Sequence, residues 1–256
     1  MASTTPAPDA RLIAALRAAR DVMVLTGAGI SAESGLPTFR DALTGYWATF
    51  RPEDLATPEA FERNPATVWA WYAERRLKAR SALPNPGHLA LVTLERWLSV
   101  RDRRFTLVTQ NVDGLHVTAG QANVIELHGS LQKVKCFRCA EPAPTWDETG
   151  KPPRCAHCGG PLRPDVVWFG EMLPVAALNA ARAAAERCDV CLSIGTSGMV
   201  EPAASLPRIA AQRGATTLTL NLDVTDRATP PRFEVRARAG AFLPALVDAV
   251  CGIGAA

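Results

Sequence analysis

The sequence has 256 residues, of which 48% are hydrophobic and 21% are charged, as is typical of globular proteins. This composition excludes a disordered chain, a collagen-like repeat and a small disulfide scaffold. The net charge of +3, from 28 basic and 25 acidic residues, is too small for the surface of a dedicated nucleic-acid-binding protein. The length allows a large buried core in one or two domains.

The start of the chain and its cysteines bear on its location. Residues 1–10 lack the basic and apolar regions of a secretion signal, so we expect them to form a disordered tail. No apolar run approaches the roughly 18 residues that a membrane-spanning helix needs. Seven cysteines are an odd number, and four of them form two CxxC pairs, which favours metal binding over disulfides. We therefore expect a cytoplasmic protein that does not associate with membranes.

Short apolar segments rich in β-branched residues alternate along the chain with segments of helical period. The predicted strands are 22–25, 105–108, 124–127, 166–169, 190–194 and 216–220. The predicted helices are 12–19, 66–80, 88–98, 175–187, 203–212 and 242–250. Strands this apolar are typical of a parallel sheet that helices cover on both faces. The sequence thus predicts an α/β fold with a doubly wound, Rossmann-like parallel sheet.

Two regions interrupt this alternation. Residues 37–86 contain helical patterns and six prolines but no strong strand, which predicts a helical insertion. Residues 131–164 contain both CxxC pairs and are rich in loops, which predicts a small zinc-binding module. The Rossmann-like domain is then discontinuous, and consists of residues 11–36, 87–130 and 165–254.

A glycine motif follows the first predicted strand. Residues 27–32 read Gly-Ala-Gly-Ile-Ser-Ala, which fits the GxGxxA pattern of dinucleotide-binding turns. In this pattern Gly27 permits a tight turn and Gly29 lets a pyrophosphate approach the backbone. A dehydrogenase would also place an acidic residue at the end of a second strand, but Glu53 and Asp54 follow a proline in a turn-like segment. The motif therefore indicates a dinucleotide site, or a tight turn without a ligand, and disfavours a dehydrogenase.

Short segments that contain polar residues follow four other predicted strands. They are Thr109, Gln110, Asn111, Val112 and Asp113 after one strand, His128 after the next, then Gly195, Thr196 and Ser197, and finally Asn221, Leu222 and Asp223. The carboxyl ends of parallel strands meet at one edge of a sheet, where open α/β sheets bind ligands. An imidazole such as that of His128 is suited to general base catalysis near neutral pH. Helix capping explains any one of these groups, but a binding site explains them together.

The four cysteines of the two CxxC pairs have the spacing of a zinc site. Cys136 and Cys139 are followed, after fifteen residues, by Cys155 and Cys158. Four thiolates complete the tetrahedral coordination of one Zn²⁺ and leave no open position, so we expect one structural zinc ion per chain. A zinc-ribbon module that binds nucleic acid is the alternative. It would use the neighbouring basic residues Lys133, Lys135, Arg138, Lys151 and Arg154, which we interpret as a solvated rim.

In this order, the motifs resemble those of the sirtuins, NAD-dependent protein lysine deacylases, from about residue 12 to residue 250. The resemblance rests on Gly27-Ala-Gly-Ile-Ser-Ala-Glu-Ser-Gly-Leu-Pro-Thr-Phe-Arg40, Thr109-Gln-Asn-Val-Asp113, His128-Gly129, the four cysteines and Gly195-Thr-Ser197. It implies that NAD is a consumed co-substrate and that the partners are proteins with acylated lysines, not nucleic acids. His128 would be the general base. The products would be deacylated lysine, nicotinamide and 2′-O-acyl-ADP-ribose.

The resemblance also assigns binding residues. NAD contacts are implied for Gly27, Ala28, Gly29, Ile30, Ser31, Glu33, Ser34, Thr38, Phe39, Arg40, Trp47, Gln110, Asn111, Val112, Asp113, Gly195, Thr196, Ser197, Asn221, Leu222, Asp223 and Ala239. Among these, Asn111 and Asp113 would line the nicotinamide pocket, and the ring of Phe39 would exclude water. The residues Val166, Val167, Trp168, Phe169 and Gly170 resemble the family segment whose backbone pairs with an extended substrate peptide.

The helical insertion differs from the common deacetylase pattern. Thr38 stands where the family usually has an acidic residue, and Tyr72 and Arg75, three residues apart, share a helix face. A phenol and a guanidinium can bind one carboxylate together. The pair resembles the Tyr-x-x-Arg signature of sirtuins that remove succinyl, malonyl or glutaryl groups, so we predict a desuccinylase or demalonylase that also has deacetylase activity.

Three alternatives stay open at this point. Tyr72 and Arg75 can be a core contact beside a basic helix face, in which case the protein is a plain deacetylase. The chain can instead be a non-enzymatic module that binds NAD or, through its zinc site, nucleic acid. An ADP-ribosyltransferase is a further alternative, since a protein side chain can capture the same electrophile.

Overall fold

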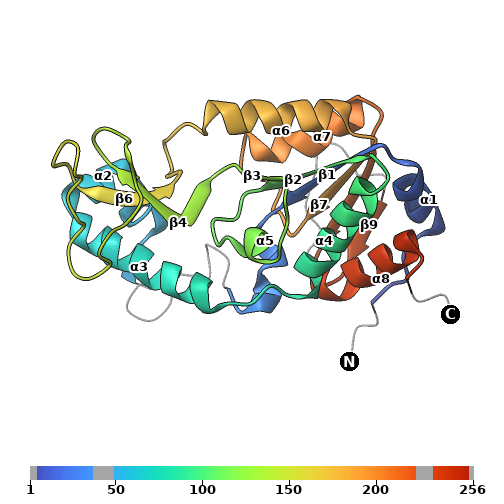
Figure 1. Cartoon of the computed structure of the whole chain (residues 1–256), viewed down its shortest axis with the longest axis horizontal. Helices are drawn as coiled ribbons and strands as arrows, with labels where there is room; N and C mark the ends of the chain where they lie inside the picture. The colour runs from blue at the N-terminus through green and yellow to red at the C-terminus, as the bar shows by residue number, and fades with distance from the viewer. Residues whose placement is uncertain (1–4, 37–48, 223–232, 254–256) are drawn as a thin grey trace.

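A parallel sheet organises the larger part of the molecule. The computed structural model describes residues 5–36, 49–222 and 233–253, and within them six parallel strands have the order β3-β2-β1-β7-β8-β9 (Figure 1). The strands are β1 (Asp21–Thr26), β2 (Arg104–Thr109), β3 (Val124–Glu126), β7 (Val190–Ile194), β8 (Thr216–Asn221) and β9 (Phe233–Arg236). This order reverses between β1 and β7, as in Rossmann-type sheets. The predicted fold class is confirmed.

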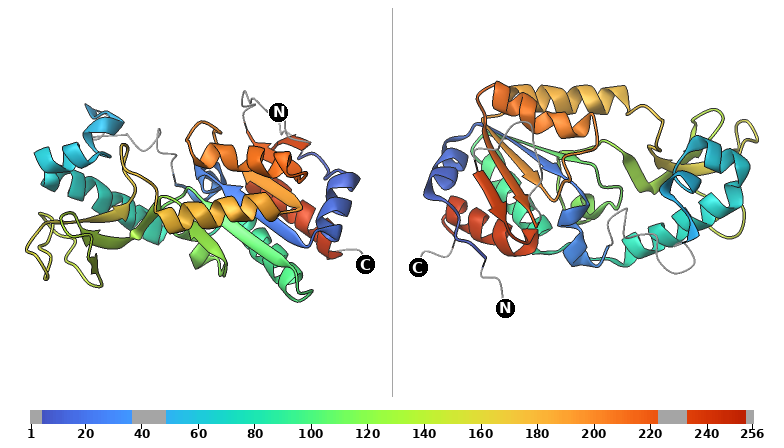
Figure 2. Two further views of the ribbon diagram at one scale, coloured as in Figure 1. Left: turned by 90° about the horizontal axis from the view of Figure 1, so that it is seen from above. Right: turned by 180° about the vertical axis from the view of Figure 1, so that it is seen from behind.

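Helices cover both faces of this sheet because alternate residues of its central strands are apolar in both directions. In β1, Val22 and Val24 pack with one group of helices, and Met23 and Leu25 pack with the other. The first group is α1 (Ala10–Ala18), α4 (Pro86–Ser99) and α8 (Ala239–Cys251), and the second is α6 (Val175–Arg187) and α7 (Leu206–Gln212), which η5 (Ala203–Ser205) precedes (Figure 2). None of the helices in the described residues is long and apolar enough to cross a membrane.

A smaller antiparallel sheet lies at the other end of the molecule (Figure 1). Its strands have the order β5-β4-β6, and they are β4 (Gly129–Cys136), β5 (Pro142–Ala143) and β6 (Leu162–Val166). The helices α2 (Pro58–Arg63) and α3 (Pro65–Ser81) pack against it, after the short turn η4 (Pro52–Asp54). The segments predicted as a helical insertion and as a zinc module thus pack together in two hydrophobic clusters, each of which contains residues of both. The exact domain boundaries stay predictions.

The start of each of these two helices follows from its sequence. The Thr57 hydroxyl accepts a hydrogen bond from the Ala60 N–H at 3.1 Å, and the Asn64 side chain accepts one from the Thr67 N–H at 3.2 Å. Each of these capping residues precedes a proline, whose fixed backbone angle and missing N–H suit the first helical position.

The strand prediction was incomplete, because β4 and β5 of the smaller sheet were not predicted, and it was wrong in two further details. The segment 166–169 was predicted as a strand of the parallel sheet, but only Val166 is in a strand, and that strand is β6 of the smaller sheet. The N–H groups of Val167 and Phe169 are bonded instead to the carbonyls of His128 and Ala56, which lie outside any ladder. The edge strand β9 was not predicted, because only its Phe233 is buried, so it lacks the apolar run of the central strands.

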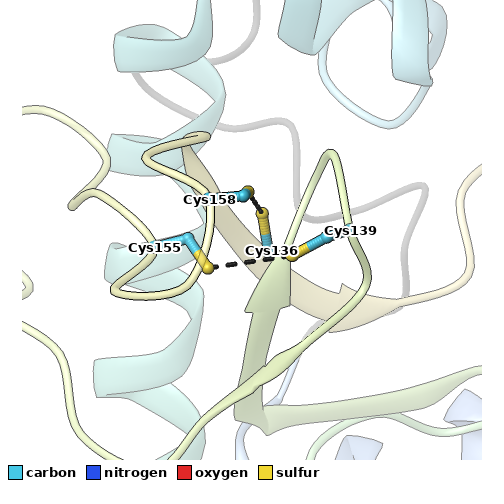
Figure 3. Close-up of side chains that lie close together, drawn as sticks. All are labelled: Cys136, Cys139, Cys155 and Cys158. Carbon is cyan, nitrogen blue, oxygen red and sulfur yellow. Dashed lines mark hydrogen bonds between the residues drawn. The ribbon is translucent and has the colours of Figure 1, made fainter.

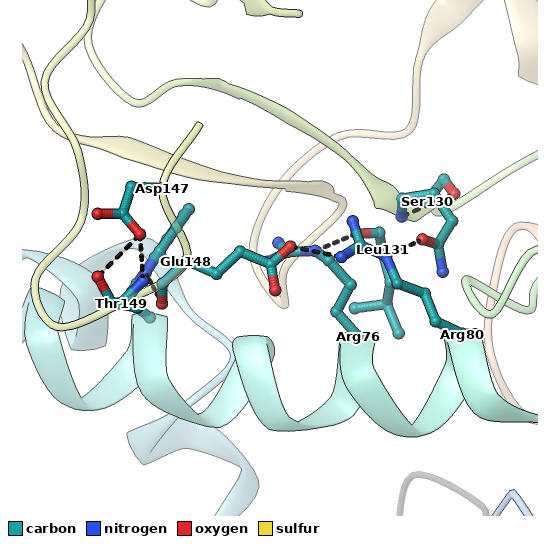
Figure 4. A network of polar contacts seen from close by, with 9 residues as sticks. Arg76, Arg80, Ser130, Leu131, Asp147, Glu148 and Thr149 are labelled. Atoms are coloured by element: carbon teal, nitrogen blue, oxygen red, sulfur yellow. Dashed lines mark hydrogen bonds and ion pairs between the residues drawn. The ribbon is translucent and has the colours of Figure 1, made fainter. Parts of the chain in front are cut away.

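A buried arginine connects α3 to the zinc module (Figure 4). The side chain of Arg76 is fully buried, its Nε donates to the Leu131 carbonyl at 2.6 Å, and its guanidinium lies 5.4 Å from the ring centres of both Trp69 and Trp146. A carboxylate of Glu148 lies 3.6 Å from Arg76 and 2.8 Å from Arg80. A buried cation needs such partners. Arg76 therefore fixes α3 on the module that contains the cysteines.

Candidate active site

Close backbone contact brings together the turns that follow β1 and β7. A Cβ atom on Gly27 would lie 2.7 Å from the carbonyl oxygen of Gly195, and a Cβ atom on Gly29 would lie 2.7 Å from the Cα of Gly195. Gly195 itself has a φ of 62°, which favours glycine. The Gly29 N–H donates to the Gly195 carbonyl at 3.0 Å. The glycine motif is thus required by the junction of these two turns, at the point where the strand order reverses.

A polar network connects the turn after β1 to the segment after β2. The side-chain amide of Asn111 donates to the carbonyl of Gly27 and to the hydroxyl of Ser31, both at 3.1 Å. The Ser31 hydroxyl donates in turn to a carboxylate oxygen of Asp113 at 2.8 Å, and the other oxygen accepts the N–H of Leu115, at the start of α5 (Leu115–Thr118), at 2.9 Å. Three of the predicted polar residues therefore meet at one place.

Burial sets the charge balance of this network. It raises the pKa of Asp113, against the opposing effects of the Leu115 N–H, the Ser31 hydroxyl and the positive charge of Arg75. Burial also lowers the pKa of Arg75, while Tyr72 and Asp113 act in the opposite direction. Arg75 on α3 and Asp113 at the edge of the parallel sheet therefore each favour the charged form of the other.

His128 lies between the two sheets, directly before β4. Its Nδ1 lies 3.0 Å from the carbonyl oxygen of Gln110, which can only accept, so Nδ1 carries a proton and donates it. This bond leaves the lone pair on Nε2. Burial lowers the pKa of the imidazole, with the Gln110 bond opposing, so the ring is neutral at neutral pH. The orientation and the charge state are those of a general base.

Two other histidines are core residues. His88 and His116 are buried with ring centres 4.8 Å apart, and burial lowers their pKa values to about 4 and about 3. His88 completes the N-terminal cap of α4 with Asn85, and His116 is hydrogen-bonded to Thr26 at 3.0 Å. Both are neutral and packed beneath the turns of the site.

Tyr72 and Arg75 lie three residues apart on α3, where Tyr72 is buried and Arg75 is half-buried. Tyr72 is 4% exposed, and its hydroxyl accepts a hydrogen bond from the indole N–H of Trp168 at 3.0 Å. Burial raises the pKa of Tyr72 to about 12, although Arg75 acts against it. The guanidinium of Arg75 lies 4.8 Å from the ring centre of Trp71. The two side chains are therefore a neutral phenol and a cation, held by aromatic neighbours.

The segment after β6 uses its N–H groups within the chain. Those of Val167, Trp168 and Phe169 donate to the His128 carbonyl, to the carboxylate of Glu171 at 2.8 Å and to the Ala56 carbonyl. A substrate peptide that pairs with this segment would therefore have to donate its own N–H groups to the carbonyl oxygens of the segment.

The other predicted NAD residues are distributed as follows. Ala28 and Ile30 form the turn η1 (Ala28–Ile30), while Glu33 and Ser34 belong to η2 (Ala32–Ser34). Val112 precedes Asp113, Thr196 is buried, Ser197 and Leu222 are exposed, Asn221 donates to the Thr196 carbonyl at 2.9 Å, and Ala239 begins α8. Thr38, Phe39, Arg40, Trp47 and Asp223 lie outside the described residues.

Three residues of this region escaped the sequence analysis. Asn85 donates to the Ile30 carbonyl at 2.7 Å and to the Ser34 hydroxyl at 3.0 Å, which ties α4 to the turn after β1. Arg163 and Glu171 pair with each other beneath Trp168. Asn85 precedes a proline, which is a capping signal, but nothing local to Arg163 or Glu171 indicates their contact.

The four cysteines lie together at one side of the smaller sheet (Figure 3). Their sulfur atoms all lie within 4.8 Å of one another, with Cys136 3.4 Å from Cys158 and Cys139 3.8 Å from Cys155. Ligands about 2.3 Å from a tetrahedral Zn²⁺ are about 3.8 Å apart, so the cluster fits this ion. All four positions are cysteine, which makes the site closed and structural. The predicted zinc site is confirmed in its donor set.

Comparison with known proteins gives one family. The family described as "SIR2: Sir2 family" matches residues 27–202. An NAD-dependent protein deacylase of Methylococcus capsulatus is 49% identical over 248 residues, which cover 93% of this chain and 96% of that protein. The crystal structure of a Sir2 homolog–NAD complex has a TM-score of 0.87 at 44% identity, and covers 94% of this chain and 93% of the other. A Sir2 homologue mutant in complex with 2′-O-acetyl ADP ribose has a TM-score of 0.88 at 43% identity, and covers 97% and 99%.

Loss of the zinc ion should unfold the smaller sheet. The free energy of zinc binding by such sites is on the order of 10 kcal/mol and is coupled to folding. We expect one zinc ion per chain by elemental analysis, and none in Cys155→Ala, which should melt at a lower temperature and change the fluorescence of the neighbouring Trp69 and Trp146. Cys251→Ala, which lies outside the cluster, is the control and should keep its zinc. A zinc-free native protein that unfolds at the same temperature would contradict this assignment.

Proposed function

We propose that this chain, which belongs to the Sir2 family and is an NAD-dependent protein deacylase, prefers acyl groups that end in a carboxylate. The observation that carries the preference is the pair formed by Tyr72 and Arg75. Both lie on α3, Tyr72 is buried and Arg75 is half-buried, and Arg75 acts electrostatically on Asp113 at the edge of the parallel sheet. A planar cation and a neutral phenol donor together match a carboxylate.

The reaction consumes NAD and gives nicotinamide, 2′-O-acyl-ADP-ribose and deacylated lysine. NAD supplies an electrophilic ribose carbon, which the carbonyl oxygen of the acyl-lysine attacks. We assign the proton transfer to His128, whose Nε2 has a free lone pair because Nδ1 donates to the Gln110 carbonyl. A neutral imidazole in this state can remove a proton from a ribose hydroxyl. Asn111 and Asp113 would line the pocket of the departing nicotinamide, and their network with Ser31 keeps both side chains in fixed positions.

The rest of NAD would be surrounded by the turns from Gly27 to Ser34, by Gln110 and Val112, by Gly195 to Ser197 and by the end of β8. This assignment is supported by the common location of these residues at the carboxyl edge of the sheet, where the strand order reverses. The substrate peptide would lie along residues 166–170 and donate its N–H groups to carbonyl oxygens there.

Two observations argue against a nucleic-acid partner. Lys133 pairs with Glu126 at 2.6 Å, and Lys135 pairs with Asp165 at 2.7 Å, so two of the five residues of the predicted basic rim have acidic partners. A phosphate-binding surface needs available cations. We also propose a cytoplasmic location, since a reducing compartment keeps four zinc-binding thiols reduced.

Replacement of His128 by alanine should abolish turnover without unfolding the protein. Loss of a general base typically lowers the rate by about 10²- to 10⁴-fold. Because the imidazole must be neutral and its pKa is lowered from 6.5, the kcat/KM of the native enzyme should stay high on the acid side of neutrality and fall only below pH 6.5. The measurements are nicotinamide release and melting temperature. Near-native deacylation by His128→Ala, at an unchanged melting temperature, would overturn the assignment.

Replacement of Arg75 by methionine should separate two activities. Succinyl-lysine loses a charge-assisted partner, and we expect its kcat/KM to fall by about 10²-fold, mostly through KM, since the carboxylate is remote from the reacting carbonyl. Acetyl-lysine has no carboxylate, so its deacylation should persist or improve. Lys78→Met, which removes a charge from the exposed face of the same helix, is the control. Equal loss of both activities in Arg75→Met would mean that Arg75 only packs against Trp71, as in a plain deacetylase.

A further inference from the structure

We propose that Trp168 is a positioning residue for acyl specificity, whose indole N–H orients the hydroxyl of Tyr72 toward the substrate carboxylate. The inference rests on the proposed preference for acidic acyl groups and adds a residue to it. Its basis is the bond of 3.0 Å from the Trp168 Nε1 to the Tyr72 oxygen, between residues 96 positions apart in the sequence.

The direction of this hydrogen bond follows from the two groups. An indole nitrogen can only donate, whereas a phenol oxygen can both accept and donate. The bond from Trp168 therefore occupies a lone pair of the Tyr72 oxygen and leaves its proton for a different acceptor. Because burial raises the pKa of Tyr72 to about 12, the phenol keeps this proton throughout the working range of the enzyme. A substrate carboxylate beside Arg75 is an acceptor of the right charge.

The indole ring that donates this bond is itself held firmly. Trp168 is 2% exposed, and its ring centre lies 5.3 Å from that of Phe61 and 6.3 Å from that of Phe137. The guanidinium of Arg163 lies 3.3 Å from the centre of the Trp168 ring. A cation against the ring face draws electron density from the indole, which strengthens its N–H as a donor.

One carboxylate fixes both the cation and the backbone of this arrangement. Glu171 accepts from Arg163 Nη2 at 2.9 Å and from the Trp168 N–H at 2.8 Å, and a second oxygen pairs with Arg163 Nη1. Burial opposes the ionisation of Glu171, but the bonds from Arg163 and Trp168 lower its pKa, so it is charged. The indole position is thus determined by contacts on its face, on its edge and on its backbone. Loss of the indole N–H should therefore change the orientation of the Tyr72 hydroxyl and leave His128 and the turns after β1 and β7 in place.

The test is Trp168→Phe, which keeps an aromatic ring and removes the N–H. The variant is assayed on one peptide sequence with either succinyl-lysine or acetyl-lysine. Trp168 also belongs to the segment along which the substrate peptide would lie, so the acetyl peptide measures any effect on peptide binding that both substrates share. The KM for the succinyl peptide should rise about three- to tenfold relative to that for the acetyl peptide, on the scale of one weakened hydrogen bond. Trp146→Phe is the matched control. Its indole nitrogen has no hydrogen-bond partner among the described residues, so both activities should be preserved.

A double-mutant cycle separates positioning from packing. In a Tyr72→Phe background there is no hydroxyl to orient, so Trp168→Phe should cause no further rise in the KM for the succinyl peptide relative to that for the acetyl peptide. The indole N–H resonance of Trp168 should also shift in Tyr72→Phe, which checks the contact without any assay of activity. Equal losses on both peptides, or an undiminished effect of Trp168→Phe in the Tyr72→Phe background, would overturn the proposal. If the native enzyme does not prefer the succinyl peptide at all, it is the proposed function that fails. Independently of activity, an unchanged indole N–H resonance of Trp168 in Tyr72→Phe would contradict the hydrogen bond between the two side chains.

Discussion

The close contact between the turns after β1 and β7 is the constraint on which the site depends. Gly27 and Gly29 can lie against Gly195 because none of the three has a side chain, and any Cβ in the first two would meet backbone atoms. This junction holds Ser31 where Asn111 and Asp113 can bond to it. A parallel sheet brings these strand ends to one edge, and the glycines let them approach closely enough to form a single polar surface.

The second requirement is that α3, which contains the specificity pair, keeps its position relative to that surface. Its buried Arg76 connects it to the zinc module through Leu131 and Glu148, while Tyr72 contacts the segment after β6 through Trp168. The zinc ion thus acts at a distance from the chemistry: it stabilises the strands and loops against which α3 packs. Arg76 can remain fully buried because the rings of Trp69 and Trp146 and a carboxylate oxygen of Glu148 lie against its guanidinium.

Much of the fold and of the site could be predicted from the sequence, because the signals are local. The strands β1, β2, β7 and β8 are apolar runs in the sequence, and the spacing of the four cysteines indicates a zinc site. The contacts that orient the side chains are not local. Trp168 and Tyr72 are distant in sequence, and so are Gly240 and Glu33, whose carboxylate accepts the Gly240 N–H at 2.7 Å. Arg76 is fully buried although it is charged, because Trp146 and Glu148 of the zinc module lie against it, and this contact is not local in sequence either.

The central claim is that the enzyme recognises the charge of the acyl group, and one measurement tests it on the unmodified protein. It compares kcat/KM for a succinyl-lysine peptide with that for the same peptide carrying the uncharged carboxamide of succinyl-lysine, which has nearly the same shape. If Arg75 and Tyr72 bind the carboxylate, the charged peptide should be preferred by at least about tenfold, mainly through a lower KM. Equal values for the two peptides would show that the acyl pocket recognises length alone, and would contradict the account.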